Sequence, residues 1–189
     1  KYIEVNLVDS MFSTLRLNLI MLMDASGNIV LSKAYDLKSN KAVAVPKGFL
    51  SYLSDKEFPL QRNHLNNNIT GIVLLPEGPL FIAGRPILKS GEKVPVRGTL
   101  IFGRYFDTDY LKKLADASDM ALDMSRFNNP ALPDDFKNAR DSLSAESPVL
   151  AKLLSKSKIA GYTTINDVYG KPALILKITM QRDIYNRGM

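Results

Sequence analysis

Three runs of apolar, β-branched and aromatic residues lie between residues 70 and 107, separated by turns rich in proline and glycine. The turns are Pro76-Glu77-Gly78-Pro79 and Lys89-Ser90-Gly91-Glu92-Lys93. Runs of this length, bounded by such turns, indicate β-strands. We therefore predict three consecutive antiparallel strands at the centre of one domain.

Side chains alternate between the two faces of a strand, so the register assigns each residue to a face. We pair Ile87 with Val96 across the second turn. One face then combines aromatic residues, small residues and two arginines: Phe81, Ala83, Arg85, Gly98, Leu100, Phe102 and Arg104. The other face carries Leu80, Ile82, Thr99 and Ile101. Because both faces are largely apolar, we expect both to be covered.

The arginine-bearing face allows two interpretations. It fits the floor of a pocket for a polar or anionic small molecule. It equally fits a core in which the two arginines form salt bridges. For the pocket, the residues that we expect to contact a ligand are Phe81, Arg85, Phe102, Arg104, Tyr52 and His64. Residues 49–64, which precede the strands, would form its lid.

Two further segments predict β-hairpins that share an Asp-x-x-Gly turn. Residues 17–35 turn at Asp24-Ala-Ser-Gly27, and residues 162–178 turn at Asp167-Val-Tyr-Gly170. Aspartate favours the first position of a turn, and glycine accepts the left-handed backbone that a bulged hairpin needs. The two hairpins show a weak internal similarity, which does not indicate a repeat architecture.

Apolar residues at helical spacing predict several helices. The predicted helices are residues 1–15, 46–53, 107–118, 134–143 and 148–154. Packing on the sheet and a helical dimer seam both fit the first helix, which is too short to establish heptads. Residues 54–69 predict a long polar loop, and residues 120–124 alternate as in a short edge strand.

Composition limits the class of protein. The chain has 189 residues, of which 46% are hydrophobic, enough for one domain with a sizeable core. No apolar run reaches the roughly 18 residues of a membrane span, and no signal peptide is present. The chain begins with Lys, so we expect an excised fragment. The net charge of +6 is scattered, which favours general surface charge over nucleic-acid binding.

The residues needed for familiar catalytic and metal sites are missing. The sequence has no cysteine and one histidine, His64, which excludes disulfides, thiolate nucleophiles, cysteine-ligated zinc and histidine-rich metal sites. Oxygen-ligated calcium sites stay open, although no EF-hand loop is present. A lone histidine on a polar loop is either solvated or a ligand contact. The acidic pair Asp134-Asp135 begins a predicted helix, where it stabilises the helix dipole. No phosphate-binding glycine motif occurs. We predict no catalytic residue, no metal and no cofactor.

Three segments and a short tail together resemble a known family. They are LLPEGPLFIAGRPIL at 74–88, RGTLIFGRYFD at 97–107, GYTTINDVYGKPALILKI at 161–178 and the trailing RDIYNRG. They resemble the fourth type of cyclase/histidine-kinase-associated sensing extracellular (CHASE) domain, in order and over nearly the whole chain. One departure is Gln181, where the family often has proline before the last arginine-containing block.

The resemblance implies an extracytoplasmic sensor, flanked by two transmembrane helices, on a prokaryotic histidine kinase or diguanylate cyclase. It implies an α+β, PAS-like (Cache-type) fold with a central antiparallel sheet of about five to seven strands. The N-terminal helix would lie behind this sheet, with short helices and loops on the other face. The family does not fix a ligand or a set of binding residues.

We therefore expect one sensor domain over residues 1–189. Residues 1–15 would end an N-terminal signalling helix, residues 17–182 would form the PAS-like core, and residues 183–189 would lead to a membrane segment. The expected partners are an unknown small molecule, a second copy in the parent receptor and the membrane through flanking segments, but not nucleic acid. The alternative is a ligand-free module for dimerisation or protein interaction at the same extracytoplasmic location.

Overall fold

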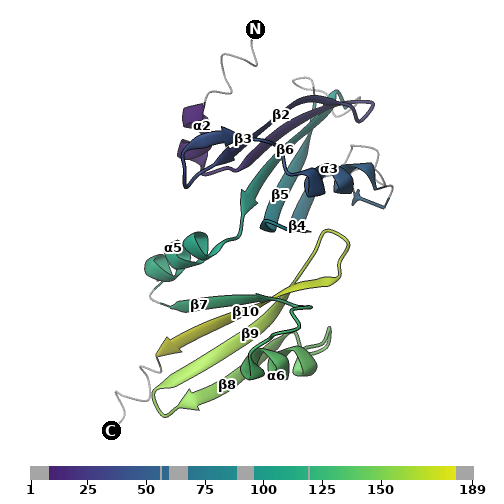
Figure 1. Cartoon of the computed structure of the whole chain (residues 1–189). Coiled ribbons are helices and arrows are strands. Elements are labelled where there is room, and N and C mark those ends of the chain that lie inside the picture. The colour runs from purple at the N-terminus through teal and green to yellow at the C-terminus, as the bar shows by residue number, and fades with distance from the viewer. Residues whose placement is uncertain (1–8, 56, 60–67, 89–95, 119, 182–189) are drawn as a thin grey trace. The chain divides into compact units, whose positions relative to one another are not determined.

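The chain forms two compact units, Lys1–Phe106 and Asp107–Met189, which we call the N-terminal and C-terminal units. The computed structural model describes residues 9–55, 57–59, 68–88, 96–118 and 120–181. One antiparallel sheet runs in the order β3-β2-β1-β6-β5-β4 and the other in the order β7-β10-β9-β8 (Figure 1). This corrects the expectation of one core over residues 17–182. An apolar run marks a strand, but it does not specify the strand's partner.

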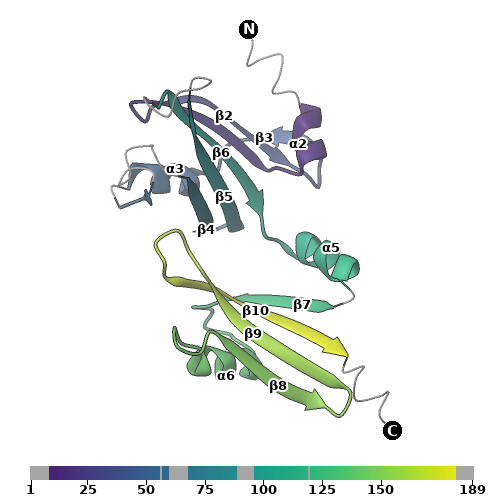
Figure 2. The same ribbon diagram turned by 180° about the vertical axis from the view of Figure 1, so that it is seen from behind.

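The N-terminal unit matches the predicted PAS-like architecture. Its elements are α2 (Asp9–Leu15), β1 (Leu19–Asp24), β2 (Ile29–Asp36), β3 (Lys41–Val43), α3 (Lys47–Ser54), β4 (Ile69–Leu75), β5 (Gly78–Ile87) and β6 (Gly98–Tyr105). The two views show α2 and α3 against opposite faces of the six-stranded sheet (Figures 1 and 2). The three strands predicted from residues 70–107 all form, although β4 lies at an edge and β1 and β6 occupy the centre.

Local turn chemistry produces the two predicted Asp-x-x-Gly hairpins. The Asp24 carboxylate accepts a hydrogen bond from the Asn28 backbone N–H at 2.9 Å, and Gly27 has a φ of 83°. The hydrogen bond from the Asn28 side chain lowers the pKa of Asp24. In the second hairpin Gly170 has a φ of 79°, and its N–H donates to the carbonyl oxygen of Asp167 at 3.0 Å. Both hairpin predictions are confirmed.

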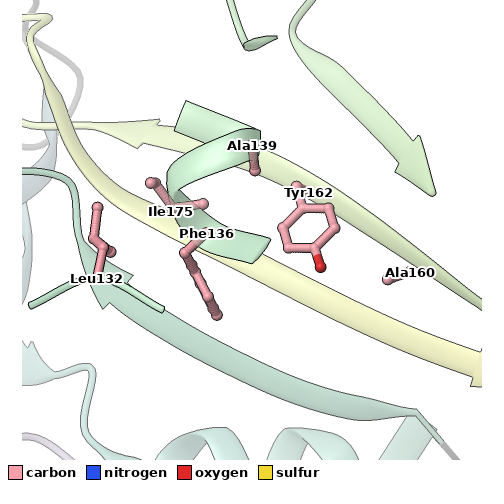
Figure 3. Close-up of a cluster of buried hydrophobic side chains, with 6 residues drawn as sticks. All are labelled: Leu132, Phe136, Ala139, Ala160, Tyr162 and Ile175. Carbon is pink, nitrogen blue, oxygen red and sulfur yellow. The ribbon is translucent and has the colours of Figure 1, made fainter. Parts of the chain in front are cut away.

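The C-terminal unit packs one helix against one face of its sheet. Its elements are α5 (Thr108–Ser118), β7 (Ala121–Arg126), α6 (Asp134–Ser142), β8 (Val149–Ser155), β9 (Lys158–Asn166) and β10 (Pro172–Gln181). Side chains from α6, the preceding loop, β9 and β10 form its core: Leu132, Phe136, Ala139, Ala160, Tyr162 and Ile175 (Figure 3). β7 is an edge strand, as predicted from its alternating pattern.

One predicted helix is a strand. Residues 148–154 were expected to be helical because their apolar residues recur at helical spacing, but Val149–Ser155 forms β8 and pairs with β9. The predicted helix was wrong because pairing with a neighbouring strand overrides the weak local preference of a short apolar run. Several of its apolar side chains stay exposed, because β8 lies at the edge of the sheet.

Asp135 fixes α6 to the sheet beneath it. Its Oδ2 accepts hydrogen bonds from the Tyr162 hydroxyl at 3.0 Å and from the Lys177 ammonium at 2.6 Å. The same ammonium lies 5.8 Å from the ring centres of Phe136 and Tyr162. The acidic start of this helix was expected to serve the helix dipole alone. Asp135 in addition joins three elements of the C-terminal unit.

Candidate ligand-binding site

The structure brings four of the six predicted site residues onto one face of the N-terminal sheet. Phe81 lies directly opposite Arg104, and Arg85 lies opposite Leu100. The register differs by two residues from the predicted one, because Ile87 pairs with Gly98. A shift of two residues leaves every side chain on its predicted face. We call this surface the arginine face: Phe81, Ala83, Arg85, Ile87, Leu100, Phe102 and Arg104.

Helix α2 covers part of the arginine face. Phe12 is fully buried and stacks on Tyr35 with 5.2 Å between ring centres. Leu100 and Phe102 pack against the cluster that these rings form with Ile20. Phe102 is therefore part of the contact between the sheet and the helix. Elsewhere on this face Phe81 packs on Phe106 at 4.8 Å between ring centres.

The predicted lid helix lies on the opposite face, apart from the arginines. A side chain at Gly48 of α3 would contact Leu75 Cδ2 at 3.3 Å. Leu75 belongs to the face opposite the arginines, as the pairing of β4 with β5 requires. Tyr52, also on α3, donates to the Leu74 carbonyl at 3.5 Å and so lies away from Arg85. The expected grouping of α3 with the arginine face is corrected: aromatic content does not reveal on which side of a sheet a helix packs.

Several other predicted features lie outside the described residues. They are His64, the turn at residues 89–93, the first part of the predicted N-terminal helix at residues 1–8 and the lead-out at residues 183–189.

The part of the opposite face around Thr99 is buried and carries small and apolar residues. We call it the Thr99 face: Met21, Met23, Ile69, Ile82, Gly84, Thr99 and Ile101. Strand pairing places all of these side chains on one side of the sheet, and each is buried. Among these described residues the Thr99 hydroxyl is the one side-chain hydrogen-bonding group. The face has no charged side chain within this set.

Thr99 carries an unsatisfied hydrogen-bonding group in the centre of the sheet. Its exposed fraction is 0%, and its Oγ1 has no hydrogen-bond partner among the residues that the structure describes. Buried hydroxyls are nearly always paired, because an unpaired one costs about 1–3 kcal/mol. Strand alternation predicts the correct face for Thr99, which was not among the predicted site residues. A lone hydroxyl among apolar residues of a central strand was the available signal.

Tyr105 lies at the end of β6 next to the Thr99 face, directly opposite Leu80. Burial, together with the negative charge of Glu77, raises the pKa of Tyr105 to about 12. The folded protein therefore keeps a proton that an unfolded tyrosine loses at pH 10.0.

We expect the stability of the protein to fall as pH rises from 10 towards 12, because the unfolded chain then binds fewer protons at Tyr105 than the folded one. Alkaline titration by tyrosine absorbance checks this: Tyr105→Phe should remove a group that ionises near 12. Loss of a group that ionises near 10 would contradict the assignment. The slope of stability against pH should be shallower in the same variant.

Neither a metal-ligating cluster nor a membrane-spanning helix is found in the described residues. Among them no group of three or more histidine, cysteine, aspartate or glutamate residues could hold a metal ion. No helix of the described segments is long and apolar enough to span a membrane.

The six-stranded antiparallel sheet with a helix against each face is the PAS-like arrangement that the sequence predicted. The extracellular domain of vpHK1S-Z8, assigned as a histidine kinase, has a similar fold: the TM-score is 0.51 at 16% identity, covering 95% of this chain and 74% of that one.

The chain belongs to the CHASE4 domain family, whose model matches residues 1–125. It is 32% identical over 189 residues to the methanogenesis regulatory histidine kinase FilI of Methanothrix harundinacea (strain 6Ac), covering all of this chain and 20% of that protein. A domain of a sensory box/GGDEF family protein from Vibrio parahaemolyticus is similar, with a TM-score of 0.49 and 16% identity. The similarity covers 94% of this chain and 77% of that one. The chain thus spans about a fifth of the length of its curated relative.

Membership of this family makes the chain a sensory domain and not a catalytic one, as predicted. The resemblance found in the sequence is confirmed for residues 1–125. The last hairpin, which also contributed to that resemblance, lies beyond the matched range. The similarity to the FilI kinase extends through it.

Proposed function

We propose that this chain is the extracytoplasmic signal-input domain of a membrane-bound prokaryotic signalling protein, and that its effector is a histidine kinase. Membership of the CHASE4 family supports the sensory role. The 32% identity to a histidine kinase over the whole of this chain supports the effector. A diguanylate cyclase is the other effector that the family allows.

We further propose that a small molecule binds on the Thr99 face of the N-terminal sheet. The unpaired, fully buried Thr99 hydroxyl is the observation that carries this proposal. A ligand atom there would satisfy a group that otherwise costs stability. Because a hydroxyl both donates and accepts, the ligand needs one polar group opposite Thr99. The apolar side chains around it favour a compact and largely apolar body.

An anionic ligand, which the sequence predicted through its two arginines, would require the arginine face instead. Arg85 is exposed there, and Phe81 and Phe102 are engaged in packing. The two faces therefore predict different ligands, and variants on each face distinguish them.

Signal transfer would use the sheet itself. Helix α2 packs against Ile20 and Tyr35 on the arginine face, and the neighbours Met21 and Met23 point to the Thr99 face. A ligand that binds one arrangement of these strands more tightly than another would shift the population of α2 positions.

Removing the Thr99 hydroxyl should have opposite effects on stability and on binding. Thr99→Val should raise the unfolding free energy of the ligand-free protein by about 1–3 kcal/mol, because it deletes an unpaired buried hydroxyl at nearly constant volume. A ligand first identified by thermal shift should bind this variant about tenfold more weakly, as expected for one lost hydrogen bond. Urea denaturation and calorimetric titration measure the two effects.

Two variants serve as controls for this experiment. Thr99→Ser keeps the hydroxyl and should keep most of the affinity. Arg85→Ala changes an exposed residue of the other face and should leave the affinity unchanged. If Arg85→Ala weakens binding and Thr99→Val does not, the ligand occupies the arginine face.

A further inference from the structure

Strand β8 of the C-terminal unit presents an apolar edge. It is the last strand in the order β7-β10-β9-β8, so in the described part of the chain only β9 pairs with it. Val149, Leu153 and Leu154 are 62%, 58% and 44% exposed. An exposed apolar edge strand is a template for pairing with another strand, and soluble proteins normally protect such edges with charge, proline or a covering element.

We propose that β8 pairs with β8 of a second copy of this chain, antiparallel about a two-fold axis at Ala151. In this register Val149 lies opposite Leu153 of the partner subunit on one face, and the symmetry repeats the contact. Leu150 lies opposite Lys152 of the partner subunit on the other face. The most exposed apolar side chains of the strand thereby cover one another. The interface is isologous, as a symmetric dimer requires.

Other registers are less favourable. Moving the two-fold axis from one residue to the next shifts the pairing of the two strands by two residues. A shift of one residue is not permitted, because it would point paired side chains to opposite faces of the sheet. A shift in one direction places Lys152 opposite its own copy, and like charges directly opposite one another destabilise a strand pair. A shift in the other direction leaves Leu153 opposite Ser147 of the partner subunit. The register centred on Ala151 pairs Val149 with Leu153 of the partner subunit and opposes no two lysines.

The symmetric register extends over Val149–Leu153. Beyond it, the pairing of β8 with β9 shifts between Leu153 and Ser155, and such a bulge ends regular strand pairing. The apolar pair of Val149 and Leu153 is therefore the contact that selects the register.

The interface is small. Two seven-residue strands cover less surface than the roughly 800 Å² per partner of a standard stable complex. The pairing is therefore weak in dilute solution. It would strengthen where attachment to one membrane raises the effective concentration of the two copies, which is the one point at which the inference rests on the proposed function.

Single cysteines test the two-fold axis, because the natural chain contains no cysteine. Residues directly opposite in an antiparallel pair have Cα atoms about 4.5–5.5 Å apart, within the range of a disulfide. Ala151→Cys in the full 189-residue chain should therefore form a disulfide-linked dimer under mild oxidation. Val149→Cys should not, because its own copy lies four residues further along, roughly 13 Å away. A mixture of Val149→Cys with Leu153→Cys should form the mixed dimer.

Introduced charges test the register independently of folding, because Val149 and Leu153 are exposed. In the Ala151→Cys background, Val149→Lys alone or Leu153→Glu alone should slow cross-linking several-fold. Both changes together should restore it, because they place opposite charges across the strand pair. Equal cross-linking of Ala151→Cys and Val149→Cys would overturn the proposal, as would a double variant that fails to restore the rate. Ligand affinity at Thr99 should not change in any of these variants, so failure here leaves the ligand proposal standing.

Discussion

Replacing Phe12 with alanine will lower the free energy of unfolding of the N-terminal unit by about 3–5 kcal/mol, the usual cost of removing a buried aromatic ring. Phe12 is the one buried residue of α2 and has no exposed surface. Its ring stacks on Tyr35 and lies 5.9 Å from the ammonium of Lys33. Without the ring, α2 keeps the partial packing of Met11, the hydrogen bond from Ser13 to Asn40 and the ion pair between Asp9 and Lys33. Such exposed polar contacts are worth little.

Urea denaturation followed by far-ultraviolet circular dichroism measures this loss. Leu15→Ala is the matched control, because Leu15 belongs to the same helix but is 50% exposed. It should change stability by no more than about 0.5 kcal/mol. Limited proteolysis should cut Phe12→Ala faster within residues 9–18. Equal losses in the two variants would mean that α2 does not pack on the arginine face.

Features set by neighbouring residues in the chain were predictable from the sequence. The two Asp-x-x-Gly hairpins form because one aspartate and one glycine satisfy the turn locally. The same reason applies to the two-residue turn at Pro76 and Glu77 and to the helix after Asp107: residues close in the sequence determine each of them. Asp107 accepts a hydrogen bond from the Tyr110 N–H at 2.9 Å, as a helix-capping residue does.

Features set by distant residues were not predictable. Nothing in β10 reveals that it pairs with β7 and β9 rather than with the first sheet, so the division into two units was missed. The β8 segment has the spacing of a helix and becomes a strand because β9 offers it a partner. The pairing of β5 with β6 was two residues from the predicted register, yet the faces were correct because strands repeat every two residues.

The candidate site was likewise predictable where it depends on neighbouring residues and not where it depends on distant ones. Alternation alone grouped Phe81, Arg85, Phe102 and Arg104 correctly on one face. It could not assign α3 to the other face, because the sequence of an eight-residue helix does not specify on which side of a sheet the helix packs. Thr99 was not selected because an unpaired hydroxyl is a property of the folded surroundings and not of the residue type.

Replacing Asp135 with asparagine will destabilise the C-terminal unit by about 2 kcal/mol. The change removes the charge that holds Lys177 at 2.6 Å and keeps an oxygen for the Tyr162 hydroxyl. Hydrogen bonds to charged groups typically contribute about 1.5–3 kcal/mol. The Asp135 and Lys177 side chains are 31% and 20% exposed, so solvent screens the pair only in part. Urea denaturation gives the loss, and hydrogen exchange of α6 locates it.

Asp134→Asn is the matched control for the helix dipole. Asp134 occupies the same first turn of α6, but its side chain is 95% exposed and its ion pair with Lys137 spans 3.3 Å. Its loss should cost no more than about 0.5 kcal/mol. If the two variants lose equal stability, Asp135 acts through the helix dipole and not through Lys177.

The dependence on pH separates the charge of Asp135 from its packing. Partial burial would raise the pKa of Asp135, but hydrogen bonds from Lys177 and Tyr162 outweigh it and lower the pKa below its usual 3.8. A carboxylate with a lowered pKa in the folded state stabilises fully above the unfolded value and loses this contribution as pH falls through the folded one. The stability difference between the natural protein and Asp135→Asn should therefore be constant near neutral pH and shrink below pH 4, because protonation then removes the same charge as the substitution. A difference that stays constant at low pH would show that altered packing, and not the ion pair, accounts for the loss.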